Sequence, residues 1–339
     1  MYNGNIYLCF MNLVTGGTGL VGAHLLLHLA QKGEKSKALY RNEITIHKTK
    51  ALFEQFQKSE LFSEIEWVEG DLNDIPALEI AFKHCTLVYH CAALISFDPT
   101  DEAILRKVNI EGTANMVNLS LAFGIEKFCY VSSIAALGDL NESETIITEE
   151  SEWNQEKAHS DYAISKYGAE MEIWRAQQEG LSCVIVNPGV ILGTGFWDSA
   201  SGEIITKIKK GMPFYTLGSS GFVAVEDLVN VMFLLMKSSF SGERFTVIAE
   251  NIDFKTLSNW IGQNFNVKPP YLYAKPWMTT LACRIDWVLS KLLLKKRILS
   301  KSMVKSLHTT AMYSNDKITK TLSFTFKPIR VYLKEISSL

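Results

Sequence analysis

The segment Val14–Gly22, with the sequence V-T-G-G-T-G-L-V-G, constrains the fold of this 339-residue chain more than any other stretch. A short apolar run at Tyr7–Val14 precedes it and is typical of a buried strand, while apolar residues at helical spacing follow from Val21 onward. A strand, a glycine turn and a helix N-terminus together direct backbone N–H groups and the helix dipole at an anion. The segment therefore predicts a phosphate-binding turn, and the alternative is an ordinary connection between strand and helix.

The glycines of this turn follow the pattern T-G-x-x-G-x-x-G, which differs by one residue from the common G-x-G-x-x-G spacing. Glycines here allow a tight bend, the close approach of a pyrophosphate and close packing of helix on strand. The residues expected to contact a dinucleotide are Thr15, Gly16, Thr18, Gly19, Leu20, Val21 and Gly22.

A second motif, Y-x-x-x-K, lies far downstream at Tyr162–Lys166. It falls within a helical pattern, so the tyrosine and the lysine lie on one face, one turn apart. An isolated Y-x-x-x-K can be an ordinary solvated helix face. Both motifs in one chain, in this order and at this separation, favour a shared site.

These two motifs resemble those of the short-chain dehydrogenase/reductase superfamily. The pattern is most similar to the extended branch, which includes epimerase/dehydratase, dihydroflavonol-reductase-like and hydroxysteroid-dehydrogenase-like members. The resemblance covers about Asn12 to Asp227. It implies an enzyme with a Rossmann-type α/β fold, in which a doubly wound parallel sheet carries a smaller C-terminal substrate lobe.

The alternation of short apolar runs with helical patterns predicts the same architecture, because such alternation yields parallel strands joined by right-handed crossovers. Further strands are expected at Ser36–Tyr40, Ile65–Val68, Thr86–His90, Lys127–Val131 and Ser182–Val186, and helices at Pro76–Phe82, Leu105–Phe123 and Tyr162–Gln178. Residues 1–188 are expected to form the dinucleotide-binding domain, with 1–10 as an extension. Residues 189–339 are expected to form mainly the substrate lobe, with 223–248 returning to the sheet.

Reduction of a carbonyl, or the reverse oxidation, requires a hydride carrier and a proton carrier. Tyr162 is the predicted proton carrier; because a free tyrosine titrates near ~10, we expect Lys166 to lower that pKa. Ser133 is predicted to hydrogen-bond the substrate oxygen, since its spacing to Gly138 matches the family better than that of Ser132. The alternative is that both hydroxyls cap the end of a strand. In the family resembled, the matching lysine also holds the nicotinamide ribose.

The resemblance assigns further residues to the site. Cofactor contacts are implied for Asp71 and Leu72 after the third strand, Cys91, Ala92 and Ala93 after the fourth, and Asn187, Pro188 and Gly189 after the sixth. Asn109 matches a helix asparagine that supports the active site, and we place it with the catalytic residues. Each match has a structural alternative, such as a turn residue, ordinary packing or a buried amide with a structural partner. Asp227 resembles a further landmark and is expected to be structural.

Arg41 departs from the usual pattern of an NAD site, which carries an acidic residue at the end of the second strand for the ribose 2′-hydroxyl. A guanidinium suits a 2′-phosphate by its charge and by its bidentate geometry. The sequence therefore favours NADP over NAD, and the alternative is an exposed arginine without this role.

The region after Pro188 bears on the substrate. Typical sugar-nucleotide epimerases carry Tyr-Gly-Pro there, whereas Val190–Phe196 is closer to the dihydroflavonol-reductase-like pattern. The region is poor in arginine and rich in aromatic residues, namely Phe196, Trp197, Phe214, Tyr215 and Phe222. We therefore expect hydride transfer to or from an apolar or aromatic ketone or aldehyde, unless these rings form the core of the lobe. The alternatives are a nucleotide-sugar epimerase or dehydratase with tightly bound NAD, and a non-catalytic dinucleotide sensor.

Composition places few demands on partners. The net charge of −2 gives no basic field for nucleic acid. The six cysteines show no metal-ligand spacing and no C-x-x-C pair, and together with the lack of a signal peptide they favour the cytoplasm. The resemblance implies a homodimer formed through the helices expected at Leu105–Phe123 and Tyr162–Gln178.

The segment 277–305 combines apolar residues at helical spacing with several lysines and an arginine toward its end. A basic amphipathic helix can lie on an anionic membrane, so peripheral membrane contact is one interpretation. Packing of this helix on the substrate lobe is the other.

Overall fold

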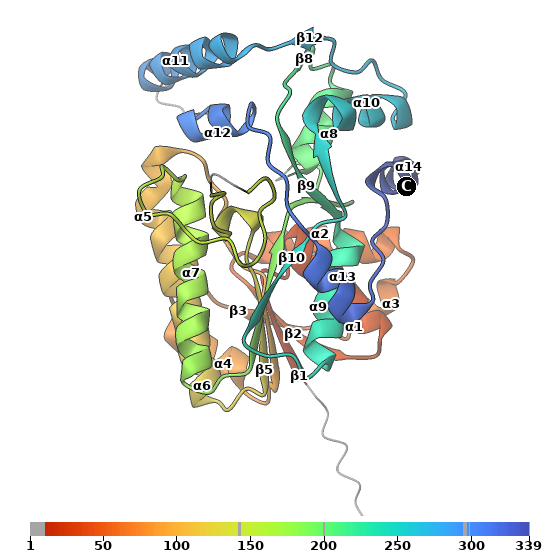
Figure 1. Ribbon diagram of the computed structural model, residues 1–339. Coiled ribbons are helices and arrows are strands. Elements are labelled where there is room, and N and C mark those ends of the chain that lie inside the picture. Colours follow the sequence, from red (N-terminus) through yellow and green to blue (C-terminus); the bar gives the residue numbers. More distant parts are fainter. Residues whose placement is uncertain (1–10, 142–143, 199–200, 294–296, 298, 339) are drawn as a thin grey trace, which may run out of the picture.

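A seven-stranded parallel sheet forms the centre of the protein, with the strand order β10-β6-β5-β4-β1-β2-β3 (Figure 1). The computed structural model describes residues 11–141, 144–198, 201–293, 297 and 299–338. The strands are β1 (Met11–Thr15), β2 (Lys35–Tyr40), β3 (Glu66–Glu69), β4 (Leu87–His90), β5 (Lys127–Val131), β6 (Cys183–Pro188) and β10 (Glu243–Val247). The predicted Rossmann-type architecture is confirmed, since the order reverses between β1 and β4 as it does in doubly wound sheets.

Successive residues of each strand pack on opposite faces of the sheet. Leu13 and Val88 contact one apolar cluster, while their neighbours Val14 and Tyr89 contact the other. Because both faces are buried, the strands appear in the sequence as nearly continuous apolar runs.

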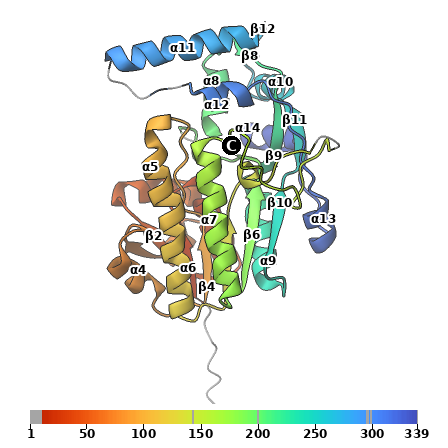
Figure 2. The same ribbon diagram turned by 60° about the vertical axis from the view of Figure 1, so that its left-hand side comes forward.

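Helices cover both faces (Figures 1 and 2). One layer holds α1 (Leu20–Gln31), α2 (Ile46–Gln55), α3 (Ser59–Phe62), α9 (Val225–Lys237) and α13 (Asp316–Leu322). The other holds α4 (Ile75–Phe82), α5 (Glu102–Leu105), the π-helical stretch η3 (Arg106–Glu111), α6 (Gly112–Ala122) and α7 (Asp161–Gln178). Ser160 caps the N-terminus of α7, since its hydroxyl accepts a hydrogen bond from the Ala163 amide at 3.1 Å.

A smaller lobe lies beyond the carboxyl ends of the strands. It contains a sheet of β7 (Val190–Leu192), β9 (Ser219–Ala224) and β11 (Glu250–Asp253), and a pair of short strands, β8 (Phe214–Tyr215) and β12 (Leu272–Tyr273). Its helices are α8 (Gly202–Lys209), α10 (Phe254–Asn264), α11 (Pro276–Leu293), α12 (Lys301–Ser306) and α14 (Ile329–Ser337). Over the described ranges, none of the helices combines the length and the apolar character needed to cross a lipid bilayer.

Two predicted segments differ in part from the structure. The run Leu105–Phe123 is not one regular helix, because η3 interrupts it before α6. Within 223–248 the expected return to the sheet is made by β10, whereas Val225–Lys237 forms helix α9, which packs against α1. The physical reason is spacing: the buried residues of α9 recur every three or four positions. Of the strand predicted at Tyr7–Val14, the described part, Met11–Val14, belongs to β1, and residues 7–10 lie outside the described residues.

Candidate active site

The carboxyl ends of β1, β4, β5 and β6 bring the predicted site residues to one edge of the sheet. The glycine turn follows β1, Cys91–Ala93 follow β4, Ser132 and Ser133 follow β5, and Asn187 ends β6. Tyr162 and Lys166 reach the same edge from the first two turns of α7. Segments far apart in the sequence therefore meet at the place where doubly wound sheets bind ligands.

The glycine turn is shaped for an anion. Gly16 has φ +70°, and a Cβ there would lie 2.8 Å from the Ala92 amide nitrogen. A Cβ at Gly22 would lie 2.1 Å from the Gly16 carbonyl oxygen, so α1 packs directly on the turn. Helix α1 begins after Gly19 without a side-chain cap and without an acidic residue in its first turn. Its first N–H groups thus face a position that a pyrophosphate fits, with Thr18, Leu20 and Val21 lying partly exposed along it.

A buried chain of hydrogen bonds supports this turn, and sequence reasoning missed it. The Thr15 hydroxyl lies 2.7 Å from His90 Nδ1, and His90 Nε2 lies 3.0 Å from the Thr113 hydroxyl. Burial lowers the pKa of His90 to about 3, so the ring is neutral. Thr15 Oγ1 also accepts a hydrogen bond from the Ala92 amide at 3.1 Å. These hydrogen bonds therefore hold β1, β4 and α6 in fixed positions next to the glycine turn.

Tyr162 and Ser133 meet at the centre of the site. Burial raises the pKa of Tyr162, and the neighbouring Ser133 hydroxyl opposes that shift. Ser133 Oγ also accepts a hydrogen bond from the Ala135 amide at 3.1 Å, so it caps the following turn as well. The exposed ring of Phe97 packs edge-on against Tyr162, with the centroids 5.7 Å apart.

Lys166 does not act on Tyr162 as the sequence led us to expect. Its ammonium is buried and donates to the Val131 carbonyl at 2.7 Å, and it lies 4.4 Å from the centroid of the Tyr130 ring. Burial lowers the pKa of Lys166 to about 7. The prediction that Lys166 lowers the pKa of Tyr162 is wrong for this structure, because burial of the phenol dominates and raises that pKa.

Glu170 is a further buried residue that sequence reasoning did not single out. Its carboxylate accepts hydrogen bonds from the Ser132 hydroxyl and from the Asn187 amide, the latter at 2.6 Å, and pairs with Arg244 at 3.3 Å. Burial raises the pKa of Glu170, while these hydrogen bonds and Arg244 lower it. The spacing Tyr162–Lys166–Glu170, four residues each, was the available signal, because it places all three on one helix face.

The two adjacent serines therefore have different surroundings. Ser132 is buried and donates to Glu170, whereas Ser133 faces Tyr162. Asn187 joins the two serine environments, because its amide also donates to the Ser133 carbonyl at 3.0 Å. Gly189 follows Pro188 where a Cβ would lie 2.3 Å from the Gly221 carbonyl oxygen, so this glycine lets β7 pack on β9.

Asn109 lies in η3 and is buried. Its carbonyl oxygen accepts from the Leu94 amide at 2.7 Å, and its amide donates to the Leu94 carbonyl and to Ser165 Oγ, both at 2.9 Å. These contacts tie the loop after β4 to helix α7. In the described contacts Asn109 is a positioning residue, and its partner Ser165 lies one helical turn from Tyr162 on α7.

The edge of the site near β2 holds a weak ion pair. Arg41 Nη1 lies 3.5 Å from Asp71 Oδ2, and 68% of the Arg41 side chain is exposed. Asp71 also accepts a hydrogen bond from the Asn73 amide at 2.9 Å, so it shapes the turn after β3. Leu72 is buried beside Gly112. Ala93 is exposed in the loop after β4, which also contains Cys91.

The aromatic residues beyond Pro188 lie mainly in the lobe rather than in the site. Phe196 and Phe222 are buried in apolar clusters, Trp197 packs on Phe265, and Tyr215 stacks on Tyr273. The alternative interpretation, that these rings form core, therefore applies to them. Asp227 accepts a hydrogen bond from the Lys327 amide at 2.7 Å and is structural, as expected.

Comparison with known proteins identifies the class that this fold and site define. The profile of the NAD dependent epimerase/dehydratase family matches residues 12–248. The chain belongs to that family, and its relatives, which are named reductases, dehydrogenases and epimerases, place it among the oxidoreductase enzymes of the extended short-chain dehydrogenase/reductase group.

Three curated relatives illustrate the range of the family. A protein named "Putative dihydroflavonol 4-reductase" from Synechocystis sp. is 31% identical over 84% of this chain and 80% of its own length. "Sterol demethylase protein B" from Methylococcus capsulatus is 29% identical over 78% of this chain and 77% of its own. UDP-glucose 4-epimerase from Vibrio cholerae is 24% identical over 72% of each chain.

Solved structures agree with the fold. The crystal structure of gox2253 superposes with a TM-score of 0.78 at 27% identity and covers 96% of both chains. UDP-glucose 4-epimerase from Thermotoga maritima superposes with a TM-score of 0.76 at 18% identity over 97% of this chain and 98% of its own. At the lower identity the likeness concerns the fold alone.

Proposed function

We propose that the protein reduces an apolar or aromatic ketone or aldehyde with NADPH, with Tyr162 as the proton donor. The observation that carries this proposal is the Tyr162–Ser133 pair beside the glycine turn. Because burial raises the pKa of Tyr162, the phenol is protonated at neutral pH and ready to donate. A protonated phenol suits reduction, in which the carbonyl oxygen takes up a proton.

In the proposed step, the Tyr162 hydroxyl donates its proton to the carbonyl oxygen while the Ser133 hydroxyl hydrogen-bonds the same oxygen. The dinucleotide supplies the hydride when bound. The turn Gly16–Gly22 and Lys166 would hold that dinucleotide, and Asn187–Gly189 would border its nicotinamide. The Glu170 carboxylate holds the Asn187 side chain in place through a hydrogen bond.

An apolar substrate is supported by the loop after β4. Phe97 packs against Tyr162 and remains 40% exposed, and Ile95 in the same loop is 54% exposed. These side chains provide apolar surface beside the proton donor, which suits an apolar substrate. A sugar diphosphate would need cationic side chains there to bind its phosphates. Relatives named for a dihydroflavonol, an anthocyanidin and a sterol support the same substrate class.

The reaction is tested by following NADPH oxidation with a panel of aromatic and alicyclic ketones and aldehydes, alongside an assay for conversion of UDP-glucose. Turnover with a carbonyl compound and none with UDP-glucose is the expected result. Conversion of UDP-glucose without net NADPH consumption would favour the epimerase alternative, which the relative from Vibrio cholerae supports. Tight dinucleotide binding without either reaction would favour a sensor.

The preference for NADPH rests on Arg41, whose exposed guanidinium makes a 3.5 Å pair with Asp71 and no other ion pair within the described part of the chain. It is free to turn to a 2′-phosphate, which it suits in charge and geometry. Fluorescence titrations should give tighter binding of NADPH than of NADH, and Arg41→Ala should remove the difference. Arg330→Ala, at an exposed arginine of α14, is the matched control. Equal binding of both dinucleotides by the unaltered protein would overturn the preference while leaving the reaction untouched.

A further inference from the structure

Helix α11 (Pro276–Leu293) lies at the end of the molecule where the strands have their carboxyl ends (Figure 2). It presents a long apolar face to solvent. The residues of this face recur every three or four positions and so line one side of the helix. They are Trp277, Leu281, Ile285, Val288 and Leu292, each between 44% and 73% exposed, and Leu289 and Leu293 beside them are exposed as well. In this helix, Cys283 is the residue whose side chain is buried.

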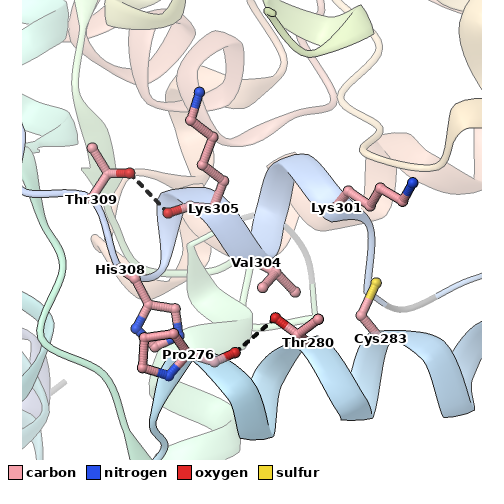
Figure 3. A pocket seen from close by; sticks show the side chains of 8 residues that line it. All are labelled: Pro276, Thr280, Cys283, Lys301, Val304, Lys305, His308 and Thr309. Atoms are coloured by element: carbon pink, nitrogen blue, oxygen red, sulfur yellow. Dashed lines mark hydrogen bonds between the residues drawn. The ribbon is translucent and has the colours of Figure 1, made fainter.

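The opposite side of α11 packs on the rest of the protein and forms hydrogen bonds with it. The Thr279 hydroxyl lies 2.8 Å from His308 Nε2, and Asp286 accepts a hydrogen bond from the Leu299 amide at 3.1 Å. Figure 3 shows Cys283 and Thr280 facing Val304 of α12 across a small pocket. The exposed apolar face is therefore not needed to hold α11 in place.

The sequence on both sides of this helix is rich in positive charge. Between Asp253 and Asp316 the sequence contains ten lysine or arginine residues and one acidic residue, Asp286, in a chain whose net charge is −2. On α11 itself, Arg284 and Lys291 are exposed and lie seven residues apart, so both border the apolar face on the same side. Lys275, just before the helix, is exposed as well.

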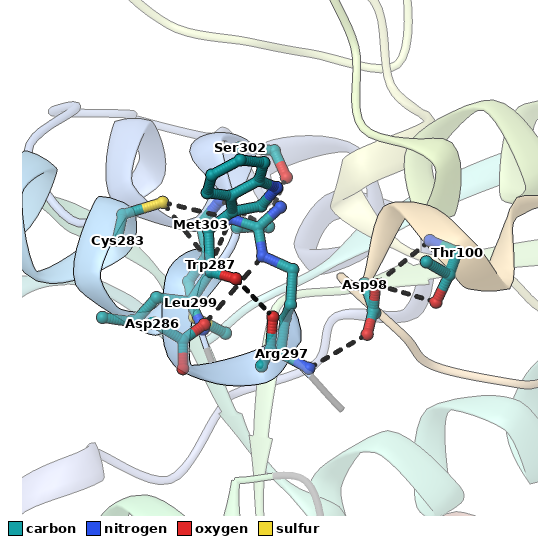
Figure 4. A network of polar contacts seen from close by, with 11 residues as sticks. Asp98, Thr100, Cys283, Asp286, Trp287, Arg297, Leu299, Ser302 and Met303 are labelled. Atoms are coloured by element: carbon teal, nitrogen blue, oxygen red, sulfur yellow. Dashed lines mark hydrogen bonds and ion pairs between the residues drawn. The ribbon is translucent and has the colours of Figure 1, made fainter. Parts of the chain in front are cut away.

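Other basic residues of this segment point elsewhere. Arg297 turns inward, where it donates to the Leu299 carbonyl at 3.0 Å and lies 4.0 Å from Asp286 (Figure 4). Lys305 extends from α12 away from α11 (Figure 3). Lys295 and Lys296, which the sequence placed in the basic end, lie outside the described residues. The charges that accompany the apolar face are therefore those of Lys275, Arg284 and Lys291.

We propose that α11 binds the surface of an anionic lipid bilayer, with its apolar face in the acyl boundary and Arg284 and Lys291 among the headgroups. Two exposed tryptophans, Trp277 and Trp287, suit the same interface, because their rings are amphipathic. Charge decides between a bilayer and a second copy of this face, since two identical basic faces repel each other whereas anionic headgroups attract them.

The proposed membrane helix is connected to the candidate active site. The Asp98 carboxylate accepts a hydrogen bond from the Arg297 amide at 3.1 Å, in the connection between α11 and α12 (Figure 4). The preceding residue, Phe97, packs on Tyr162. The loop that contains Phe97 and Asp98 and borders the proton donor therefore contacts the connection between α11 and α12. An apolar substrate would be drawn from the same bilayer, a corollary that rests on the proposed function, whereas membrane binding itself does not.

Flotation of the full-length protein with vesicles tests the proposal without any substrate. Vesicles of phosphatidylcholine mixed with phosphatidylglycerol should carry the protein upward, and vesicles of phosphatidylcholine alone should carry less. Leu281→Glu combined with Leu292→Glu should abolish flotation. The matched control, Ile80→Glu combined with Val331→Glu on the exposed faces of α4 and α14, should leave it unchanged. Circular dichroism and urea denaturation verify that each variant is folded.

The electrostatic part has its own test. Arg284→Gln combined with Lys291→Gln should lower the partition coefficient on anionic vesicles by roughly fivefold for each charge. The control pair Lys50→Gln and Lys334→Gln, at exposed lysines of α2 and α14, should not. Absence of flotation on anionic vesicles would overturn the proposal. So would a concentration-dependent dimer in analytical ultracentrifugation that the two glutamates abolish while vesicles recover no protein, because a second copy would then cover the face.

Discussion

Replacement of Lys166 by methionine should make the protein more stable, because the native structure buries this ammonium at a cost. Its pKa falls from an ordinary value of 10.5 to about 7 on folding, mainly through burial. Above pH 10.5 Lys166 does not lower the free energy of unfolding. As the pH falls toward 7 this free energy decreases, because the lysine of the unfolded chain binds a proton before the buried lysine does. At about 1.36 kcal/mol for each pKa unit, the loss at pH 7 is roughly 4 kcal/mol.

The methionine variant also loses the hydrogen bond to the Val131 carbonyl, which costs about 1–3 kcal/mol where a buried acceptor is left unpaired. We therefore expect a net gain of roughly 2 kcal/mol at pH 7 in the free energy of unfolding. The hydrogen-bond cost is independent of pH, but the proton-linked gain is not. Between pH 7 and pH 9 the advantage of the variant should shrink by roughly 2 kcal/mol, since the unfolded lysine approaches its own pKa.

Urea denaturation of both proteins at a series of pH values measures this difference directly. Lys50→Met, at an exposed lysine of α2, serves as the control and should show no such pH dependence. A stability difference between Lys166→Met and the unaltered protein that stays constant with pH would refute the reasoning. If the gain appears while turnover is lost, Lys166 is kept for its function and not for the fold.

Two further changes separate support of the fold from binding and catalysis. Gly22→Ala places a Cβ 2.1 Å from the Gly16 carbonyl and should lower the unfolding free energy by about 2–3 kcal/mol in urea titrations. Gly19→Ala, whose Cβ would lie 3.4 Å from the nearest atom, should leave stability intact and weaken NADPH binding in fluorescence titrations. Ser132→Ala should destabilise the protein by about 1–3 kcal/mol, because Glu170 loses a buried donor. Ser133→Ala should instead lower kcat, with a loss of about 1 kcal/mol in stability from the cap of the following turn. Equal effects of the two serine variants on both readouts would contradict the separate roles given to them.

Local sequence patterns were sufficient to predict much of the sheet. The predicted and observed bounds of β5, Lys127–Val131, coincide, and β2 and β4 each differ by one residue at the start. These strands are buried on both faces, so each is an apolar run with clear limits. Helix α9 was missed because its N-terminal Val225 directly follows the strand residues Val223 and Ala224, and the apolar run gives no boundary.

Contacts between distant segments could not be predicted in the same way. Glu170 and Arg244 are 74 residues apart, and Thr15 and His90 are 75 apart, so no local periodicity reports either contact. The direction of the Tyr162 pKa was also beyond the sequence, because it depends on burial, and spacing alone suggested that Lys166 dominates. The assignment of Ser133 to Tyr162 and Ser132 to Glu170 likewise required the orientation of the chain after β5.

The central claim is that Tyr162 transfers the proton, and Tyr162→Phe tests it most directly. Once a carbonyl substrate has been found, the variant should bind NADPH within about twofold of the unaltered protein, while kcat falls by roughly 10²–10⁴. Tyr167→Phe is the matched control on the same helix, where Tyr167 stacks on Trp153, and it should retain its turnover. A Tyr162→Phe protein that binds NADPH and reduces the carbonyl at the rate of the unaltered protein would contradict the account.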